Sequence, residues 1–286
     1  MRDRIDPLIE ERAPWLATGS PLVRPARALL NRALQYEPTV ALGERLQDLP
    51  IAPLMDELAR LLCKDVTVSG LHHVPRHGPA LVVANHPTGI ADGIVLWHVL
   101  SKVRPDLYIF TNRDILRVMP QFADLIIPVE WRAEKRTHAK ARETMALTKT
   151  AVEQGRLGVI FPSGRLAKRV GLRLHERPWM PSAAMLARKF ELPVVPINIR
   201  ARNSLLFYLF DAIHPTLRDI TLFHEMLNKD RQPYVVTIGE EIGPASLPAS
   251  SEEGIEMLKR ATLALGDRED RTISMIAATR RPAFLS

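Results

Sequence analysis

Residues 80–92 read Ala-Leu-Val-Val-Ala-Asn-His-Pro-Thr-Gly-Ile-Ala-Asp, and this stretch decides the fold. It opens with a short uncharged apolar run, which is typical of a buried β-strand. Pro87 and Gly89 then force a turn, and we expect a helix to begin at or just before Asp92. A strand that ends in a polar turn and leads into a helix is the unit of α/β proteins. In open sheets of this kind the chemistry usually lies at the carboxyl ends of the strands.

The alternation of strands and helices continues along the chain. Further β-rich runs are predicted as strands at 66–69, 107–111, 124–129, 157–161, 194–199 and 234–238. Helical patterns fall between them at 92–102, 137–154, 181–190 and 216–228. This order predicts an α/β fold with a mixed, largely parallel central sheet flanked by helices.

The α/β region is expected to have helical segments on both sides. Residues 1–63 are predicted as an N-terminal helical extension, clearest at 53–62, where one face carries Leu54, Leu58, Leu61 and Leu62. Packing on the core suits this face better than contact with lipid. Residues 64–245 would form the main domain, and residues 246–286 a C-terminal helical tail packed on it.

The composition indicates a basic protein with an apolar core. The chain of 286 residues has 39 Lys and Arg against 32 Asp and Glu, a net charge of +7. Such a surface attracts the phosphates of lipids, nucleotides or nucleic acids. Basic residues gather in two clusters: Arg132, Lys135, Arg136, Lys140 and Arg142, and then Arg165, Lys168, Arg169, Arg173 and Arg177. A solvated helix face is the simpler interpretation of the first cluster.

Several classes of protein are not expected. Nucleic acid is an unexpected partner, because no helix-turn-helix, aromatic stacking motif or zinc ligand set accompanies the charge. Cys63 is the single cysteine and the His residues are scattered, so neither an intrachain disulfide nor a metal site is predicted. No apolar run approaches the roughly 18 residues of a spanning helix, and residues 1–30 lack a secretory signal pattern. We expect a cytoplasmic protein, peripherally associated with the inner face of the cell membrane.

The turn after the first strand carries a possible base. The carboxylate of Asp92 can reach back to His86, which fixes one tautomer and leaves the other ring nitrogen free to accept a proton. Transfer of an acyl group from a thioester to an alcohol needs such a base, because an uncharged hydroxyl attacks poorly. A thioesterase or lysophospholipase in which His86 activates water remains an alternative, as does a non-catalytic lipid-binding protein.

Two other predicted strands end in candidates for anion binding. After 157–161 come Ser163 and Gly164, small enough to open backbone N–H groups to a ligand, and Arg165, which can hold a phosphate through two donors. Lys168 extends the positive field. Arg113 follows the strand at 107–111. A structural turn explains the first site equally well. Capping of a neighbouring helix, or pairing with Asp114 or Asp124, would explain the second.

Residues 66–243 resemble the glycerophospholipid acyltransferase family, which includes glycerol-3-phosphate and lysophosphatidic acid acyltransferases. Its Asn-His followed by Asp is matched by Asn85, His86 and Asp92, and its second block by Arg113. Its third and fourth blocks are matched by Phe161, Pro162, Gly164 and Arg165, and by Val195 and Pro196. The resemblance implies that His86 is the general base and Asp92 its partner. It places the acceptor among Asn85, Arg113, Ser163, Gly164, Arg165 and Lys168.

The chain departs from this family's pattern at two points. One more residue than usual separates His86 from Asp92, and Ser163 stands where the family usually has Glu, which removes a negative charge. Segments 202–208, 217–219 and 225–229 are similar to a bacterial branch labelled haemolysin or ornithine-lipid acyltransferase-like, a hint about the acceptor.

The resemblance implies an O-acyltransferase that uses acyl-CoA or acyl carrier protein (acyl-ACP) as co-substrate and no cofactor. The acceptor would be a lysophospholipid-like molecule, 1-acylglycerol-3-phosphate or lyso-ornithine lipid, met at a membrane surface. The apolar run 205–210 is a candidate tunnel wall or interfacial patch, although an ordinary core helix is the simpler interpretation.

Overall fold

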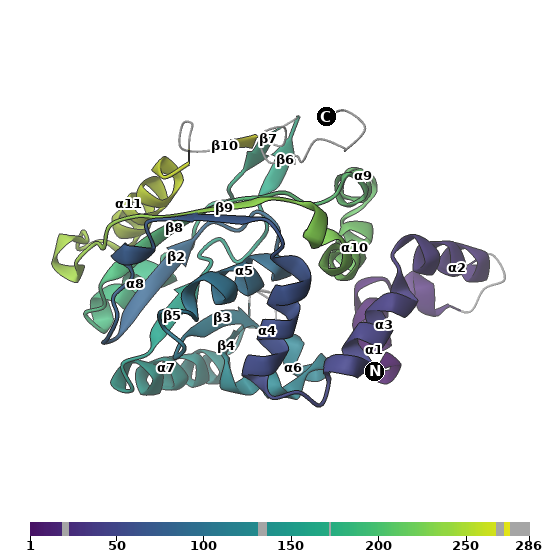
Figure 1. Ribbon diagram of the computed structural model, residues 1–286, viewed down its shortest axis with the longest axis horizontal. Coiled ribbons are helices and arrows are strands. Elements are labelled where there is room, and N and C mark those ends of the chain that lie inside the picture. Colours follow the sequence, from purple (N-terminus) through teal and green to yellow (C-terminus); the bar gives the residue numbers. More distant parts are fainter. Residues whose placement is uncertain (19–22, 131–135, 172, 267–271, 275–286) are drawn as a thin grey trace.

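The computed structural model describes residues 1–18, 23–130, 136–171, 173–266 and 272–274. Its centre is a seven-stranded sheet with the strand order β1-β9-β8-β2-β5-β3-β4 (Figure 1). The strands are β1 (Val66–Ser69), β2 (Ala80–Ala84), β3 (Tyr108–Asn112), β4 (Ile126–Val129), β5 (Leu157–Ile160), β8 (Val194–Arg200) and β9 (Tyr234–Ile238). Each lies within a residue or two of a predicted strand, so the strand predictions are confirmed.

The sheet is mixed and mostly parallel, as predicted. β2 pairs in parallel with β5 on one side and β8 on the other, with Val82 opposite Val159 and Val195. β3 continues the parallel set between β5 and β4. β8 and β9 pair in antiparallel orientation, so β9 and its parallel partner β1 run against the other strands.

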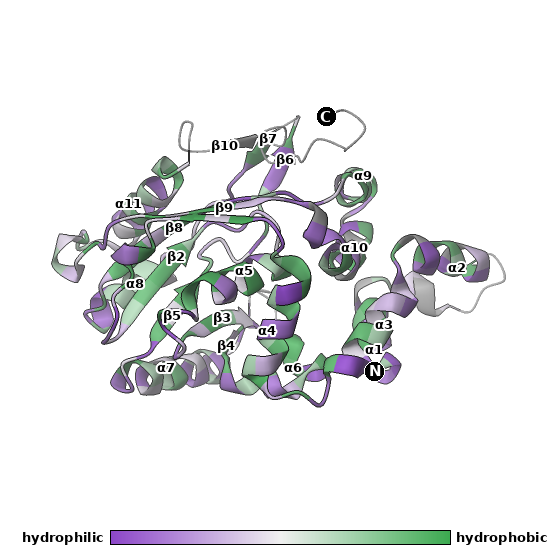
Figure 2. Cartoon of the chain, in the orientation of Figure 1, coloured by the Kyte–Doolittle hydropathy of each residue, from purple (hydrophilic) through white to green (hydrophobic). Residues whose placement is uncertain are grey.

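Two apolar layers cover the sheet because successive side chains of β2 point to opposite faces. Val82 and Ala84 belong to the core shared with α4 (Ile51–Leu62) and α5 (Ile90–Leu100). Leu81 and Val83 belong to the core shared with α7 (His138–Glu153), α8 (Ser182–Lys189) and α11 (Ser251–Ala264). Figure 2 shows β2 as a hydrophobic strand between these layers.

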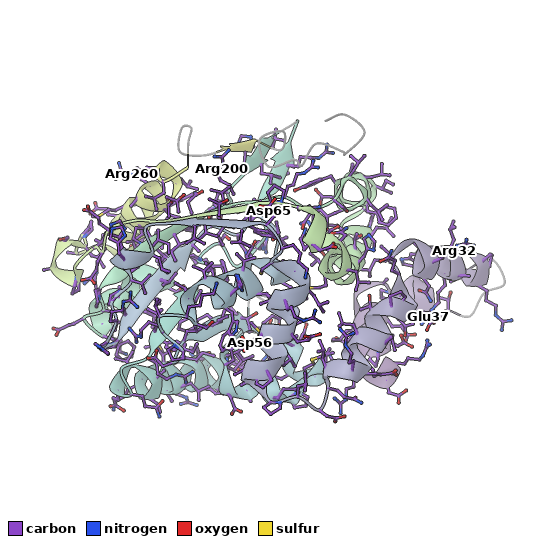
Figure 3. The ribbon with its side chains drawn as sticks, viewed as in Figure 1. Arg32, Glu37, Asp56, Asp65, Arg200 and Arg260 are labelled. Atoms are coloured by element: carbon purple, nitrogen blue, oxygen red, sulfur yellow. The ribbon has the colours of Figure 1, made fainter. Side chains whose placement is uncertain are left out.

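The leucine face of α4 packs on the core, as predicted, rather than facing outward. Leu54, Leu58 and Leu62 are buried in the cluster that α4 shares with α5. The two helices are also joined by a hydrogen bond from Nε1 of Trp97 to Oδ1 of Asp56, 3.0 Å long; Figure 3 marks Asp56 on α4.

The N-terminal region is helical, as predicted. It contains α1 (Arg2–Arg12), α2 (Val23–Ala33) and α3 (Tyr36–Leu46) before α4. α1 and α3 share a small apolar cluster with Val118 of α6 (Ile115–Val118). Arg32 and Glu37, on α2 and α3, lie far from the sheet in Figure 3.

Some elements are absent from the sequence prediction. β6 (Lys168–Val170) and β7 (Arg173–His175) form a hairpin that pairs with β10 (Thr272–Ser274). The run 205–210, for which a helix was the simpler interpretation, lies in α9 (Leu205–Ile213), which packs against the predicted helix α10 (Pro215–Asn228). Short 3₁₀ turns are η1 (Pro14–Ala17), η2 (Leu71–His73), η3 (Pro120–Asp124), η5 (Lys229–Arg231) and η6 (Pro244–Ser246).

Some predictions fall at the limits of the described chain. Arg132 and Lys135, of the first basic cluster, lie outside the described residues, while Lys140 pairs with Glu130. α11, in the C-terminal tail, packs against α8; the domain boundaries at 63 and 246 stay a prediction. Among the described helices, none combines the length and the apolar character needed to cross a bilayer.

Candidate active site

The candidate residues come from three neighbouring strands. β2, β5 and β3 are consecutive in the sheet and parallel, so their carboxyl ends meet at one edge. His86 follows β2, the turn 161–165 follows β5, and Arg113 follows β3. These three segments therefore lie along one edge of the sheet.

His86 and Asp92 lie in contact at the end of β2. Nδ1 of His86 is 2.9 Å from Oδ2 of Asp92, and the imidazole is 18% exposed whereas the carboxylate is fully buried. Nδ1 makes no aligned hydrogen bond, which is common for catalytic pairs before substrate binds. With Nδ1 turned to Asp92, Nε2 is the nitrogen left for a substrate.

The turn between the two residues holds the Asp92 carboxylate in place. The backbone N–H groups of Thr88 and Gly89 each donate to Oδ2 at 2.9 Å, and the hydroxyl of Thr88 donates to Oδ1. Asp92 lies in the first turn of α5, where the helix dipole favours a negative charge. Gly89 has a φ of +92°, and a Cβ there would come within 3.0 Å of Leu166. The glycine turn therefore accommodates the longer His-Asp spacing.

Two further residues fix the position of His86. The side-chain amide of Asn85 donates to the carbonyl of Ile199 (2.9 Å) and accepts from its N–H (2.7 Å), which ties β2 to β8. Because this amide is fully buried and both its oxygen and its nitrogen are hydrogen-bonded, Asn85 has a structural role: it fixes the geometry of this edge of the sheet. On the other side, the ring of Phe161 stacks on His86 with centroids 4.4 Å apart.

The turn after β5 is held by hydrogen bonds within it, and basic side chains are exposed beside it. The hydroxyl of Ser163 donates to the carbonyl of Arg165 (2.7 Å), and the N–H of Gly164 donates to the carbonyl of Phe161 (2.9 Å). Gly164 has a φ of +58°, a conformation that favours glycine. The turn leaves Arg165 and Lys168 exposed.

Arg113 has a different partner from those considered in the sequence. Its guanidinium pairs with the carboxylate of Glu143 on α7, and 40% of its side chain is exposed. Its contact with a substrate stays a prediction.

Glu176 was missed by sequence reasoning although it lies against His86. Its Oε2 accepts the backbone N–H of His86 at 3.3 Å, and its Oε1 accepts Nε1–H of Trp179 at 3.0 Å. Desolvation raises the pKa of its carboxyl, while the hydrogen bonds from Trp179 and from the backbone of His86 act against the shift. Ninety positions separate Glu176 from His86, so no local pattern joins them.

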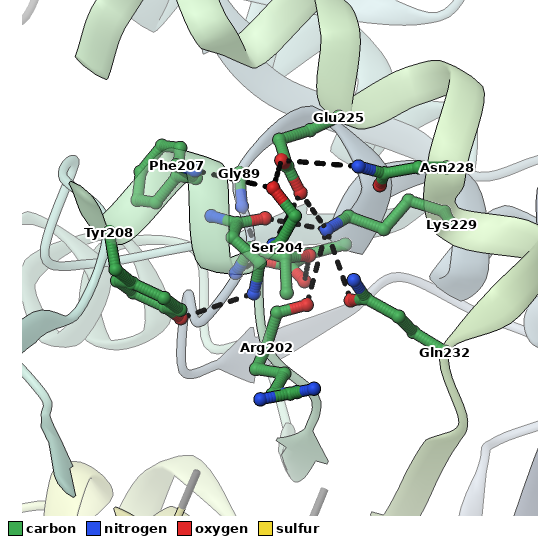
Figure 4. A network of polar contacts seen from close by, with 12 residues as sticks. Gly89, Arg202, Ser204, Phe207, Tyr208, Glu225, Asn228, Lys229 and Gln232 are labelled. Atoms are coloured by element: carbon green, nitrogen blue, oxygen red, sulfur yellow. Dashed lines mark hydrogen bonds and ion pairs between the residues drawn. The ribbon is translucent and has the colours of Figure 1, made fainter. Parts of the chain in front are cut away.

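A buried polar network lies beside the turn (Figure 4). Nζ of Lys229 is fully buried and donates to Oε2 of Glu225 (2.7 Å), Oδ1 of Asn203 (2.6 Å) and the carbonyl of Arg202 (3.1 Å). Glu225 also accepts the N–H and hydroxyl of Ser204, the N-cap of α9. The segments 202–208 and 225–229 that carry the branch resemblance are thus packed together.

Charge balance within this network favours an ion pair. Desolvation acts to raise the pKa of Glu225, but Lys229 and Ser204 outweigh it and the net shift is downward. Burial lowers the pKa of Lys229, and the attraction of Glu225 and of Asp92 offsets only part of that effect.

Residues 65–200 match the family model described as Acyltransferase. A lyso-glycine lipid O-acyltransferase of Phocaeicola vulgatus is 26% identical over 183 residues, which cover 62% of this chain and 64% of that protein. A protein of the same name from Bacteroides thetaiotaomicron is 23% identical over 214 residues, covering 73% and 76%. The crystal structure of a 1-acyl-sn-glycerophosphate acyltransferase from Thermotoga maritima has a TM-score of 0.48 at 14% identity, covering 94% of this chain and 99% of that one.

Proposed function

Because residues 65–200 match the acyltransferase family model, we propose that this protein transfers a fatty acyl group from a thioester to the hydroxyl of a lysolipid. The observation that carries the proposal is the contact between His86 and the buried carboxylate of Asp92 at the carboxyl end of β2. No Ser or Cys nucleophile is needed, because the acceptor hydroxyl attacks directly.

In this mechanism His86 accepts the hydroxyl proton at Nε2 as the acceptor oxygen bonds to the thioester carbonyl carbon. Asp92 holds the ring and stabilises the imidazolium that forms. The carbon–sulfur bond then breaks, and the departing thiolate takes the proton from His86. The base is restored in each turnover and the atoms balance without a cofactor.

The acceptor is proposed to be a lysolipid with an amino-acid headgroup. Two relatives are named lyso-glycine lipid O-acyltransferases, which favours this class over 1-acylglycerol-3-phosphate and agrees with the lyso-ornithine lipid suggested by the sequence. An anionic headgroup suits the exposed Arg165 and Lys168 beside the turn after β5. Arg113, Ser163 and Gly164 are proposed to border the same site. The donor is proposed to be acyl-CoA or acyl-ACP.

The protein is proposed to work at a membrane surface without spanning it, in the cytoplasm at the inner face of the cell membrane. α9 supports this, because it is amphipathic: Phe207 and Tyr208 are buried, while Leu205, Leu209 and Ile213 are exposed. These three residues recur every fourth position and share one face of the helix. We name them the α9 apolar row.

The test is transfer of radiolabel from acyl-CoA, and separately from acyl-ACP, to a panel of acceptors. The panel holds lyso-glycine lipid, lyso-ornithine lipid, 1-acylglycerol-3-phosphate, glycerol 3-phosphate and no acceptor. A labelled diacyl product that requires an amino-acid lysolipid is expected. Free fatty acid released in every arm would instead identify a hydrolase, and lack of reaction with either donor would leave a lipid-binding protein.

His86→Ala is expected to reduce transfer by at least about 100-fold, the contribution of a general base, with an unchanged circular dichroism spectrum. His77→Ala is the matched control, because His77 is exposed and precedes β2, whereas His86 follows the opposite end of that strand, and it should keep parental activity. Parental turnover by His86→Ala would reject the mechanism.

A further inference from the structure

The turn after β5 carries Ser163 at a position where a carboxylate was expected, yet the site does not lack a carboxylate. Glu176 follows β7 and brings its side chain to the same place. It touches the backbone of His86, the indole of Trp179 and the side chain of Ser163. Glu176 therefore places a carboxylate beside this turn from another segment of the chain.

Both oxygens of Glu176 act as acceptors. Oε2 faces the N–H of His86 and Oε1 faces the indole N–H of Trp179, which is itself buried. An ionised carboxylate has no hydrogen of its own and can accept from both donors. An amide or a protonated acid carries a hydrogen on one of the two positions, which would point toward a donor or weaken that position as an acceptor. The geometry thus selects the charged form at a place where desolvation opposes it.

The charged groups around Glu176 give the carboxylate a direct relation to the reaction. His86 and Arg177 interact with it electrostatically, and Asp92 contacts Nδ1 of the imidazole. As His86 accepts a proton it becomes a cation, and a nearby carboxylate favours that cation. A purely structural acceptor would not need the charge.

We propose that Glu176 is a positioning residue for His86: it anchors the His86 backbone at the end of β2 and supplies the carboxylate that Ser163 does not. It acts through His86 and does not touch the reacting atoms. The expected kinetic effect rests on the proposed function. The effect of Glu176 on the His86 ring does not, because it can be measured without any substrate.

The first experiment is a pH titration of the His86 ring by NMR in the parent and in Glu176→Gln, which keeps the size and removes the charge. The midpoint of the titration is expected to fall in the variant, because the imidazolium loses a favourable neighbour. Glu176→Asp, which keeps the charge, should return the midpoint toward the parent. Equal midpoints in all three proteins would overturn the proposal, whether or not acyl transfer is observed.

Kinetics provide the second readout. Glu176→Gln is expected to lower kcat by about tenfold or more and to change KM by less than about threefold. The reason is that the interaction between the carboxylate and His86 matters mainly when His86 gains its proton. The acid limb of the kcat/KM profile should move to lower pH. Glu256→Gln, on the exposed face of α11, is the matched control and should behave as the parent. A Glu176→Gln variant with parental kcat and profile would overturn the proposal.

The pH dependence of stability tests whether the Glu176 carboxylate is charged and desolvated in the folded chain. Because desolvation raises the pKa of Glu176 above its ordinary value of 4.5, the folded chain binds that proton more tightly than the unfolded chain. The resulting stability is present below pH 4.5 and is lost as the pH rises through the raised pKa. Glu176→Gln removes this loss, so its Tm relative to the parent should be higher at pH 7 than at pH 4. A relative Tm that does not change between these pH values would contradict the charged, desolvated carboxylate.

Discussion

The buried carboxylate of Asp92 is contacted by groups from the turn and from the end of β2. Thr88 and Gly89 donate to it from the turn, and His86 contacts it from the end of β2. Since a buried carboxylate needs hydrogen-bond donors, the turn sequence Pro-Thr-Gly is what allows Asp92 to lie behind the imidazole. The geometry of the dyad is therefore set by backbone groups as much as by its two side chains.

Gly164 is the residue in the turn after β5 whose backbone conformation most restricts substitution. Its φ is +58°, and a Cβ would find only Met180, at 3.6 Å. The strain of Gly164→Ala is therefore conformational rather than steric, and we expect it to lower the free energy of unfolding by about 1–2 kcal/mol. Urea denaturation followed by circular dichroism measures this change.

Gly243→Ala is the control for that measurement. Gly243 has a φ of −64°, and a Cβ added there would meet no described atom within 4 Å. Alanine there should be neutral or stabilise by up to about 1 kcal/mol. Equal losses at positions 164 and 243 would show that the left-handed turn is not what holds the Ser163–Arg165 segment.

At the scale of elements, α9 and α10 are joined by the buried pair of Glu225 and Lys229. Lys229→Met leaves the Glu225 carboxylate buried without its cation, and we expect a loss of about 3–5 kcal/mol in the free energy of unfolding. The measurement is urea denaturation at neutral pH. Because Ser204, the N-cap of α9, also donates to Glu225, protection of the α9 amides against hydrogen exchange should fall as well.

A double variant tests whether the loss comes from the unpaired charge. Adding Glu225→Gln removes that charge but keeps an oxygen that can accept from Ser204, so it should recover at least about 1 kcal/mol. Lys149→Met is the matched control, because Lys149 and Glu153 form a pair with the same spacing whose side chains are largely exposed; stability should not change. A double variant less stable than the single one would refute this account of the pair.

The strands could be predicted from the sequence because each is a short apolar run whose burial is decided locally. Ala80–Ala84 is buried along its whole length, and its composition alone indicates this. The direction of β9 could not be predicted, since its antiparallel pairing with β8 depends on a connection through α9 and α10. The β6–β7 hairpin was missed because its strands are short and rich in basic residues, which do not resemble a core strand.

Some contacts of the candidate site could likewise be predicted from the sequence and others could not. His86 and Asp92 lie within one turn, so their contact follows from the local sequence. Glu176 reaches His86 only because the hairpin returns the chain to the end of β2, and no spacing rule foresees that. Glu225 and Lys229 have the spacing of a helical ion pair, but their burial depends on how α10 packs beside α9.

At the scale of the whole molecule, α9 and the β6–β7 hairpin form a region next to the edge that carries His86. Ala167 and Leu174 pack with Phe207 and Tyr208 in one cluster, and Arg169 lies over the ring of Tyr208 at 5.8 Å. The carbonyl of His86 accepts the N–H of Ala167, which connects this cluster to the dyad. The α9 apolar row thus lies on the outer face of a helix whose inner face packs near the site.

If the α9 apolar row meets a membrane, removing one of its members should weaken binding to lipid without damaging the fold. Leu209 is 55% exposed, so Leu209→Asp should leave the Tm unchanged while vesicle binding falls by about tenfold or more, the value of burying one leucine. Sedimentation with anionic vesicles measures binding. The net charge of +7 predicts weaker binding to zwitterionic vesicles and in high salt.

Leu147→Asp provides the comparison, because Leu147 is 41% exposed on α7, a helix that covers the opposite face of the sheet from α4 and α5. It should bind vesicles like the parent.

Leu209→Asp should also transfer acyl groups to a dispersed short-chain acceptor at the parental rate. It should lose activity only when the acceptor is presented in vesicles, since the change lies on the surface and not at His86. Equal binding by the two variants would assign the row another role. Loss of activity in both assays would mean that α9 supports the site itself, because a surface that serves only to hold the membrane has no effect on an acceptor already in solution.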